Sequence, residues 1–154
     1  MAALFASVGV DPGKAQSLAD AIADYRDDDN LPRPRGAEEA EYRDAGLAWG
    51  PKNAPFQTVE ELQQVLGMTP EIYGRVAPDL SVYSITATLP ATADERLTGV
   101  LHQAGFNSLA TSPMIIFSIR AEAKSANGGV FVREAIVQSY PDQAWILSWR
   151  QGGP

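Results

Sequence analysis

Apolar positions in the first part of the chain recur at the three- and four-residue intervals that define one helix face. Asp11 can cap a helix here, and Pro12 can take its first position, where an N–H group is not needed. The pattern therefore predicts a helix from about Pro12 to Arg26. The apolar stripe of this helix consists of Leu18, Ala19, Ile22 and Tyr25.

A second helical region follows in "TVEELQQVLGMTPEIYGRV". Thr58 with Glu61 three residues later forms a capping box, and Gly67 ends the apolar stripe that follows. Thr69, followed by proline, starts another helix, so this region is predicted as helix, glycine hairpin, helix. The chain around Gly9 has the same order, which indicates a weak internal repeat.

The pattern changes after this region. The run "LSVYSITATL" (residues 80–89) is typical of a strand, and "TADERLTGVLHQAG" (residues 92–105) predicts an amphipathic helix. Three β-rich runs follow at residues 115–124, 128–139 and 144–150. "SANGG" joins the first two and "YPDQ" joins the last two, and both are turn sequences. The end of the chain is therefore predicted to be an antiparallel meander.

These patterns predict the α+β class with two parts. Residues 1–82 form a helical, helix-hairpin-helix-like domain with an acidic loop, and residues 83–154 form a small antiparallel β-sheet with one packed helix. On the last strand, Trp145 and Trp149 are spaced so that they would share one face. We expect that face to belong to the core, with a partner-binding surface as the alternative.

Composition narrows the possible functions. The chain has 154 residues with 12 Lys+Arg against 19 Asp+Glu, a net charge of -7, which disfavours binding to a phosphate backbone. The absence of cysteine excludes disulfides, thiolate nucleophiles and cysteine-ligated zinc. His102 is the only histidine and lies in no recognisable catalytic context, so we expect a protein that is not an enzyme.

The acidic run "DYRDDDN" (residues 24–30) is the strongest candidate for chemistry. Asp24, Asp27 and Asp29 are spaced so that several oxygens can converge on one hard cation, which prefers oxygen ligands. The loop at residues 27–57 is long for a compact domain, and a metal could order it. The alternative is a solvated acidic loop in which these carboxylates end the helix and pair with Arg26, Arg33 or Arg35.

Several segments together resemble a known family. They are "LADAIADYRDDDNLPRPRGAEEAEY", "PKNAPFQTVEELQQVLGMTPEIYGRVAPDLSVYS" and "FSIRAEAKSANGGVFVREAIVQ…AWILSWRQG". This order is similar to that of the minor pseudopilin K of type II secretion systems, the general secretion pathway protein K family. In that family an aspartate-rich segment and a "GAE" precede an "N-x-P-x-x-x-x-x-E-L" and a "G-M" helix, and a hairpin and a tryptophan-containing strand close the chain.

The resemblance implies a pilin-like fold and a calcium ion bound by the helical domain. The family pattern falls on Asp24, Asp27, Asp29 and Glu38. It also implies a structural role at the tip of the pseudopilus, together with the minor pseudopilins of the I and J types. Further oxygen ligands could come from Asp28, Asn30, Glu39, Glu41 and Asp44.

The resemblance also carries an expectation about location. The family begins with a prepilin leader and a hydrophobic transmembrane helix, and neither pattern is present in this sequence. We therefore expect the chain to correspond to a soluble, periplasmic C-terminal portion, and the full-length protein to be anchored in the inner membrane by a single pass.

Two alternatives stay open at this point. The glycine hairpins are also typical of a helix-hairpin-helix module that binds nucleic acid, but such hairpins work with neighbouring Lys or Arg, and here Glu71 and Asp11 flank them. The other alternative is a calcium-dependent binding domain that has no role in secretion.

Overall fold

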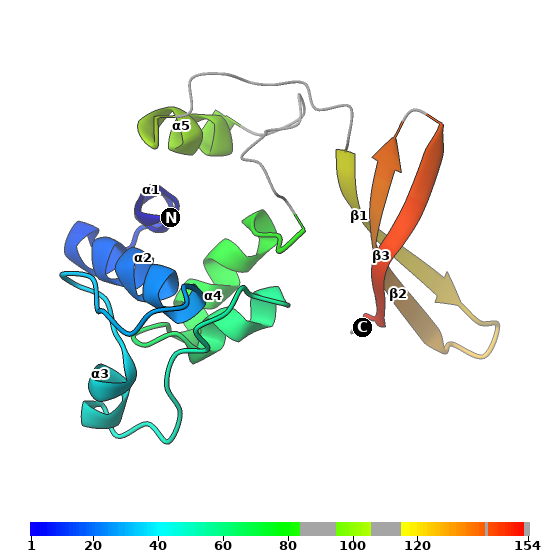
Figure 1. Ribbon diagram of the computed structural model, residues 1–154. Coiled ribbons are helices and arrows are strands. Elements are labelled where there is room, and N and C mark those ends of the chain that lie inside the picture. Colours follow the sequence, from blue (N-terminus) through cyan, green and yellow to red (C-terminus); the bar gives the residue numbers. More distant parts are fainter. Residues whose placement is uncertain (84–94, 106–114, 141, 153–154) are drawn as a thin grey trace. The chain divides into compact units, whose positions relative to one another are not determined.

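The computed structural model describes residues 1–83, 95–105, 115–140 and 142–152 and has helices followed by a three-stranded sheet (Figure 1), which confirms the α+β class. The chain divides into two units. The helical unit comprises Met1–Val82 and Asp94–Asn107, and the sheet unit comprises Tyr83–Ala93 and Ser108–Pro154. In the described part of the chain, no helix has both the length and the apolar character that crossing a membrane requires.

The predicted helix from Pro12 to Arg26 is confirmed as α2, and Asp11 caps it by accepting a hydrogen bond from the Lys14 N–H at 3.1 Å. The described helical elements are α1 (Ala2–Ser7), α2 (Pro12–Arg26), α3 (Glu39–Asp44), the 3₁₀ helices η1 (Val59–Gln64) and η2 (Ala77–Asp79), α4 (Pro70–Val76) and α5 (Glu95–Gln103).

Both predicted glycine hairpins are present. Gly9 between α1 and α2 has φ 85°, and Gly67 between η1 and α4 has φ 82°, a region that favours glycine. The helix predicted after Thr58 is a 3₁₀ helix, η1, which closes with i→i+3 hydrogen bonds. The hairpins pack on each other: Arg75 of α4 donates to the Val8 carbonyl at 3.1 Å, and Leu18 of α2 lies against Gly67.

Aromatic residues join the long loop to the core of the helical unit. Tyr25 is buried in α2, stacks on Phe56 with ring centroids 4.9 Å apart, and donates a hydrogen bond to Gln64. Tyr42 of α3 is fully buried, and its hydroxyl accepts a hydrogen bond from the Leu66 N–H at 2.9 Å. These contacts link η1 to α2 and link α3 to the residues that follow η1. Around them lie Leu4, Phe5, Leu18, Ile22, Leu62, Val65, Ile72 and Val76.

The prediction that one helix packs on the sheet is wrong for α5. This helix contacts α1, and its Leu97 and Val100 pack against the core of the helical unit. Arg96 strengthens this attachment by donating to Asp79 at 2.6 Å. An amphipathic helix buries its stripe on any apolar surface that fits it, and here the helical unit supplies that surface. The predicted second domain therefore loses this helix to the first.

The sheet is an antiparallel meander with the order β1-β2-β3, as predicted. Its strands are β1 (Ile115–Lys124), β2 (Val130–Tyr140) and β3 (Gln143–Gln151). Residues 84–89 of the strand predicted at 80–89 lie outside the described residues, and no strand forms over residues 80–83.

The prediction for the two tryptophans is wrong. Ile136 pairs with Ser148 and Val137 pairs with Ile146, so Leu147 is an extra residue in β3. This bulge reverses the alternation. Trp145 therefore lies opposite Gln138, whereas Trp149 lies opposite Ala135. Because those two β2 positions are three residues apart, the tryptophans occupy opposite faces. They are 47% and 66% exposed, so neither belongs to a core.

Candidate metal centre

The acidic run lies at the carboxyl end of α2. Asp27 follows the last helical residue with an extended backbone, and Asp28 and Asp29 come directly after it. The free carbonyl groups at this end of a helix carry partial negative charge, which disfavours carboxylates nearby. Three acidic residues at this position are therefore unfavourable unless water or a cation compensates their charge.

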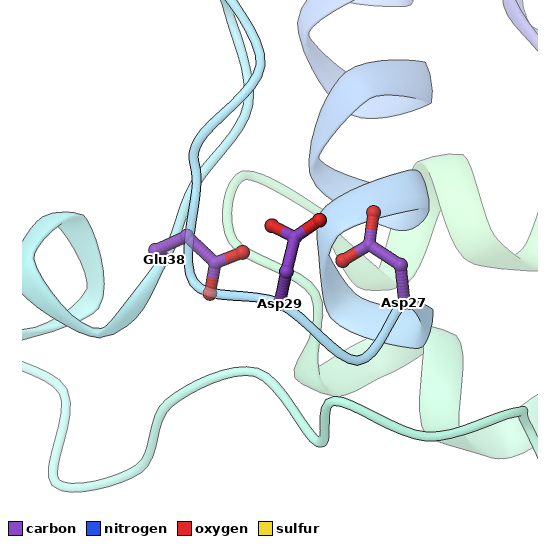
Figure 2. A group of neighbouring side chains, drawn as sticks. All are labelled: Asp27, Asp29 and Glu38. Atoms are coloured by element: carbon purple, nitrogen blue, oxygen red, sulfur yellow. The ribbon is translucent and has the colours of Figure 1, made fainter.

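Three carboxylates converge at this point. Asp27, Asp29 and Glu38 each place one oxygen within 4.8 Å of the others. Figure 2 shows Asp27 and Glu38 turning their carboxyl groups toward that of Asp29. Glu38 lies directly before α3, so the loop between the two helices returns to the end of α2. The site therefore closes a loop that the sequence leaves without regular structure.

Glu38 is the most constrained residue of the three. It is 4% exposed, and neither of its carboxylate oxygens has a hydrogen-bond partner among the described residues. Burial raises the pKa of Glu38, and the negative charges of Asp24, Asp27, Asp29 and Glu41 raise it further. A buried carboxylate without a donor is costly unless a charge pairs with it. Within the part of the chain that the structure describes, no ion pair neutralises Glu38.

Arg33 supplies part of the compensation. Its Nη1 donates to Asp24 Oδ1 at 2.6 Å and to Asp27 Oδ2 at 2.5 Å. The hydrogen bonds to Asp27 and Asp24 raise the pKa of Arg33. Asp27 Oδ1 is nevertheless buried without a donor among the described residues. Pairing with Arg33 was one part of the solvated-loop alternative, but it leaves Asp29 and Glu38 without a cation.

Asp24 has a different position from the one that the family pattern implies. It is fully buried, and its oxygens accept hydrogen bonds from Arg33 Nη1, from the Arg33 N–H at 3.1 Å and from the Ala37 N–H at 2.8 Å. It is not in the converging group. Asp24 instead folds the loop so that Glu38, one residue after Ala37, faces Asp27.

One residue that shapes the site, Gly36, was missed in the sequence, whereas Arg33 had been named as a possible partner and neutralises Asp24 and one oxygen of Asp27. Gly36 lies so close to Asp24 that a side chain there would overlap Asp24 Oδ2 and come within 2.8 Å of its Cγ. The signal for Gly36 was the "RPRGAE" sequence, which places a glycine two residues before Glu38.

The other candidate ligands are not brought into the group. Glu39 pairs with Arg43, Glu41 accepts a hydrogen bond from the Glu38 N–H, and Asn30 accepts one from Asn53. Asp28 and Asp44 are exposed.

The oxygen ligands of this group fit a hard cation. All three converging groups are carboxylates, each of which offers one oxygen to the site, and none of the ligand atoms is nitrogen or sulfur. Calcium takes six to eight oxygens in flexible geometry, whereas zinc and copper favour imidazole and thiolate. The buried oxygens of Glu38 and Asp27 without donors are the atoms that such an ion would satisfy.

Comparisons with known proteins agree with one another. The family model described as "Type II secretion system (T2SS), protein K" matches residues 1–85. The type II secretion system protein K of Klebsiella pneumoniae is 35% identical over 75 residues, which are 49% of this chain and 23% of that protein. The same protein of Dickeya chrysanthemi is 33% identical over 78 residues, which are 51% of this chain and 21% of that protein. The chain therefore spans about a quarter of the length of these curated relatives.

A solved structure extends the likeness to the sheet. A chain in the crystal structure of the GspK–GspI–GspJ complex from the type 2 secretion system of enterotoxigenic Escherichia coli has a TM-score of 0.65 with this chain. The match covers 99% of this chain and 69% of that one at 16% sequence identity. Similarity at this identity shows that the two share a fold.

Proposed function

Because the chain belongs to the protein K family of type II secretion systems, we propose that it serves as a minor pseudopilin, a structural part of the secretion machinery. The family match lies on the helical unit, which holds the candidate metal centre. The proposed role is assembly at the tip of the pseudopilus, where a bulky helical unit would prevent further subunits from adding. The proposed location is the periplasm, with the full-length protein held in the inner membrane.

The proposal includes a calcium ion held by Asp27, Asp29 and Glu38. The observation that carries it is the pair of Glu38 oxygens, which are buried without a donor and face two further carboxylates. The ion would supply positive charge that Arg33 does not bring to this side of the site. It would also link the end of α2 to the start of α3, so its binding energy would order the loop between them.

Calcium-dependent stability tests this part of the proposal. Binding to the native state alone raises stability by RT ln(1 + [L]/Kd), which is about 2.7 kcal/mol at a hundredfold excess of calcium over Kd. We expect calcium to raise the melting midpoint and chelator to lower it. Asp27→Asn with Asp29→Asn should remove the difference, whereas Asp28→Asn, an exposed neighbour, should retain it. Identical wild-type melting curves in calcium and in chelator would contradict the proposal.

The proposed partners are minor pseudopilins of the I and J types. The support is the structural neighbour, whose own chain assembles with GspI and GspJ. A role in assembly rather than catalysis is supported by chemistry as well: His102 is the only histidine in the sequence, and it is exposed on α5. A Ser-His-Asp arrangement needs a histidine that is held by an acidic residue and a nucleophile.

Binding to these partners is measured with the chain and the soluble domains of I- and J-type pseudopilins from one secretion system. Size-exclusion chromatography and calorimetry should detect a complex in calcium and a weaker complex in chelator. The reason is that calcium would order a loop of the helical unit. If the chain binds neither domain at any concentration, the pseudopilin proposal fails, even if calcium stabilises the protein. Stabilisation by calcium without binding to either domain would favour a calcium-dependent binding domain outside secretion.

A further inference from the structure

A surface pocket lies beside α3 in the helical unit. Its volume is about 270 Å³, close to the lower end of the range for small-molecule sites. Its walls come from α3 and from the irregular segments on either side of that helix. The residues that determine its chemistry are Asn30, Glu39, Arg43, Trp49, Pro51 and Asn53. None of the three converging carboxylates lines the pocket, so it is distinct from the candidate metal centre.

Trp49 gives the pocket an aromatic wall. Its indole Nε1 donates a hydrogen bond to the Gln64 carbonyl at 3.3 Å, which ties one edge of the ring to the protein. The side chain is nevertheless 50% exposed. An aromatic ring that is held at one edge and open over much of its surface can stack on a flat ligand with little loss of side-chain entropy. Trp49 therefore favours a ligand with a flat apolar face.

Two asparagines supply neutral hydrogen-bonding groups. Asn53 Nδ2 donates to Asn30 Oδ1 at 3.0 Å, so each side chain fixes the other. The backbone of Asn53 is held as well, because its N–H donates to the Tyr25 carbonyl at 3.0 Å. Asn53 Oδ1 is buried without a donor among the described residues, and the side-chain N–H groups of Asn30 have no acceptor among them. The wall therefore offers an acceptor and donors in fixed positions.

The charged residues of the pocket neutralise each other. Arg43 Nη2 donates to Glu39 Oε1 at 2.5 Å across one turn of α3, and the other lining residues are neutral. A ligand anion would meet Glu39 and a ligand cation would meet Arg43, so the pocket attracts neither strongly. An apolar ligand would cover the amides of Asn30 and Asn53 without satisfying them. The lining therefore fits a neutral ligand that both donates and accepts hydrogen bonds.

We propose that this pocket binds one pyranose ring of a neutral saccharide. The C–H groups of a pyranose form a flat apolar face, which stacks on Trp49 and is thereby removed from water. The hydroxyl groups of the sugar both donate and accept, so they match Asn53 Oδ1 and the N–H groups of Asn30. The inference goes beyond the role in secretion, and it uses no ligand of the proposed calcium ion.

The test is an NMR titration of the isotope-labelled full chain with maltotriose, cellotriose and chitotriose, which differ in linkage and in N-acetylation. The sequence has three tryptophans, and each gives one indole N–H signal. We expect at least one sugar to shift the Trp49 signal with a dissociation constant of about 1 mM, since an open pocket buries little ligand surface. The signals of Trp145 and Trp149 should stay in place. Sorbitol, which has the hydroxyl groups but no ring, should shift none of the three.

Variants of the chain locate the effect, with binding followed on backbone N–H signals of the pocket. Trp49→Ala should weaken binding about tenfold or more because the stacking surface is lost, and Trp49→Phe should retain part of the affinity. Asn30→Ala should weaken binding severalfold. Trp149→Ala is the matched control, because it removes a tryptophan that is also exposed but lies on the sheet. Melting curves check that each variant is folded, and Asn30→Ala decides if Trp49→Ala is not.

Three outcomes would overturn the proposal. They are no shift of the Trp49 signal with any of the sugars, a shift with sorbitol or inorganic phosphate as large as that with the sugars, and equal weakening by Trp149→Ala and Trp49→Ala. The titration involves no secretion protein. Failure to bind the I and J domains would therefore leave the saccharide site intact, and failure with the sugars would leave the pseudopilin proposal intact.

Discussion

Replacing Gly36 with alanine should destabilise the helical unit through Asp24. A Cβ at this position would overlap Asp24 Oδ2, lie 2.8 Å from Asp24 Cγ and lie 3.2 Å from Arg33 Cβ. Asp24 cannot turn aside freely, because it is fully buried and held by three donors. The backbone must move instead, and the N–H groups of Arg33 and Ala37 then leave the carboxylate.

The size of the effect follows from these two hydrogen bonds. Each backbone N–H that donates to a charged group contributes about 1.5–3 kcal/mol, so we expect a loss of about 3–6 kcal/mol in the free energy of unfolding. This corresponds to a fall of about 10 °C or more in the melting midpoint of the helical unit. The displacement of Ala37 also moves Glu38, so the calcium response should weaken.

Thermal melting followed by circular dichroism, in calcium and in chelator, measures both effects of Gly36→Ala. Gly74→Ala is the matched control, since Gly74 lies within α4 and has no atom within 4 Å of an added Cβ. Alanine there should raise stability by about 0.5–1 kcal/mol because glycine is the poorer helix former. If Gly36→Ala melts at the wild-type temperature, the close approach to Asp24 does not hold the loop, and the reasoning is refuted.

Three further predictions concern the helical unit. Because the pKa of Glu38 is raised, the metal-free folded state holds a proton on this carboxyl group more tightly than the unfolded chain does. The contribution of Glu38 to stability should therefore decrease as pH rises above 4.5. Glu38→Gln should therefore melt higher than wild type in chelator at neutral pH but lose the calcium response, and equal midpoints in chelator would contradict this. Tyr42→Phe should lower the free energy of unfolding by about 1–3 kcal/mol in denaturant titrations, because the Leu66 N–H loses its acceptor; an unchanged midpoint would rule this out. Duplex DNA should migrate unchanged with the protein at low salt, given the net charge of -7, and a salt-sensitive shift would revive the helix-hairpin-helix alternative.

Local chemistry determined much of this protein from the sequence alone. The bounds of α2 follow from Asp11 and Pro12 at its start and from the acidic run at its end. The first strand and its hairpin were predictable because alternation and "SANGG" act within a few residues. Asp27, Asp29 and Glu38 were predicted as candidates by local crowding and by family resemblance, and the structure brings them together.

Contacts between distant residues decided the rest. Asp24 looks like its acidic neighbours in the sequence. Only the folded loop shows that the N–H groups of Arg33 and Ala37 donate hydrogen bonds to its carboxylate. Helix α5 has an apolar stripe, and only the folded chain shows that its Leu97 and Val100 pack against the core of the helical unit. The single extra residue Leu147 puts Trp145 and Trp149 on opposite faces, because side chains alternate along a strand and a bulge is defined only by its pairing with the neighbouring strand.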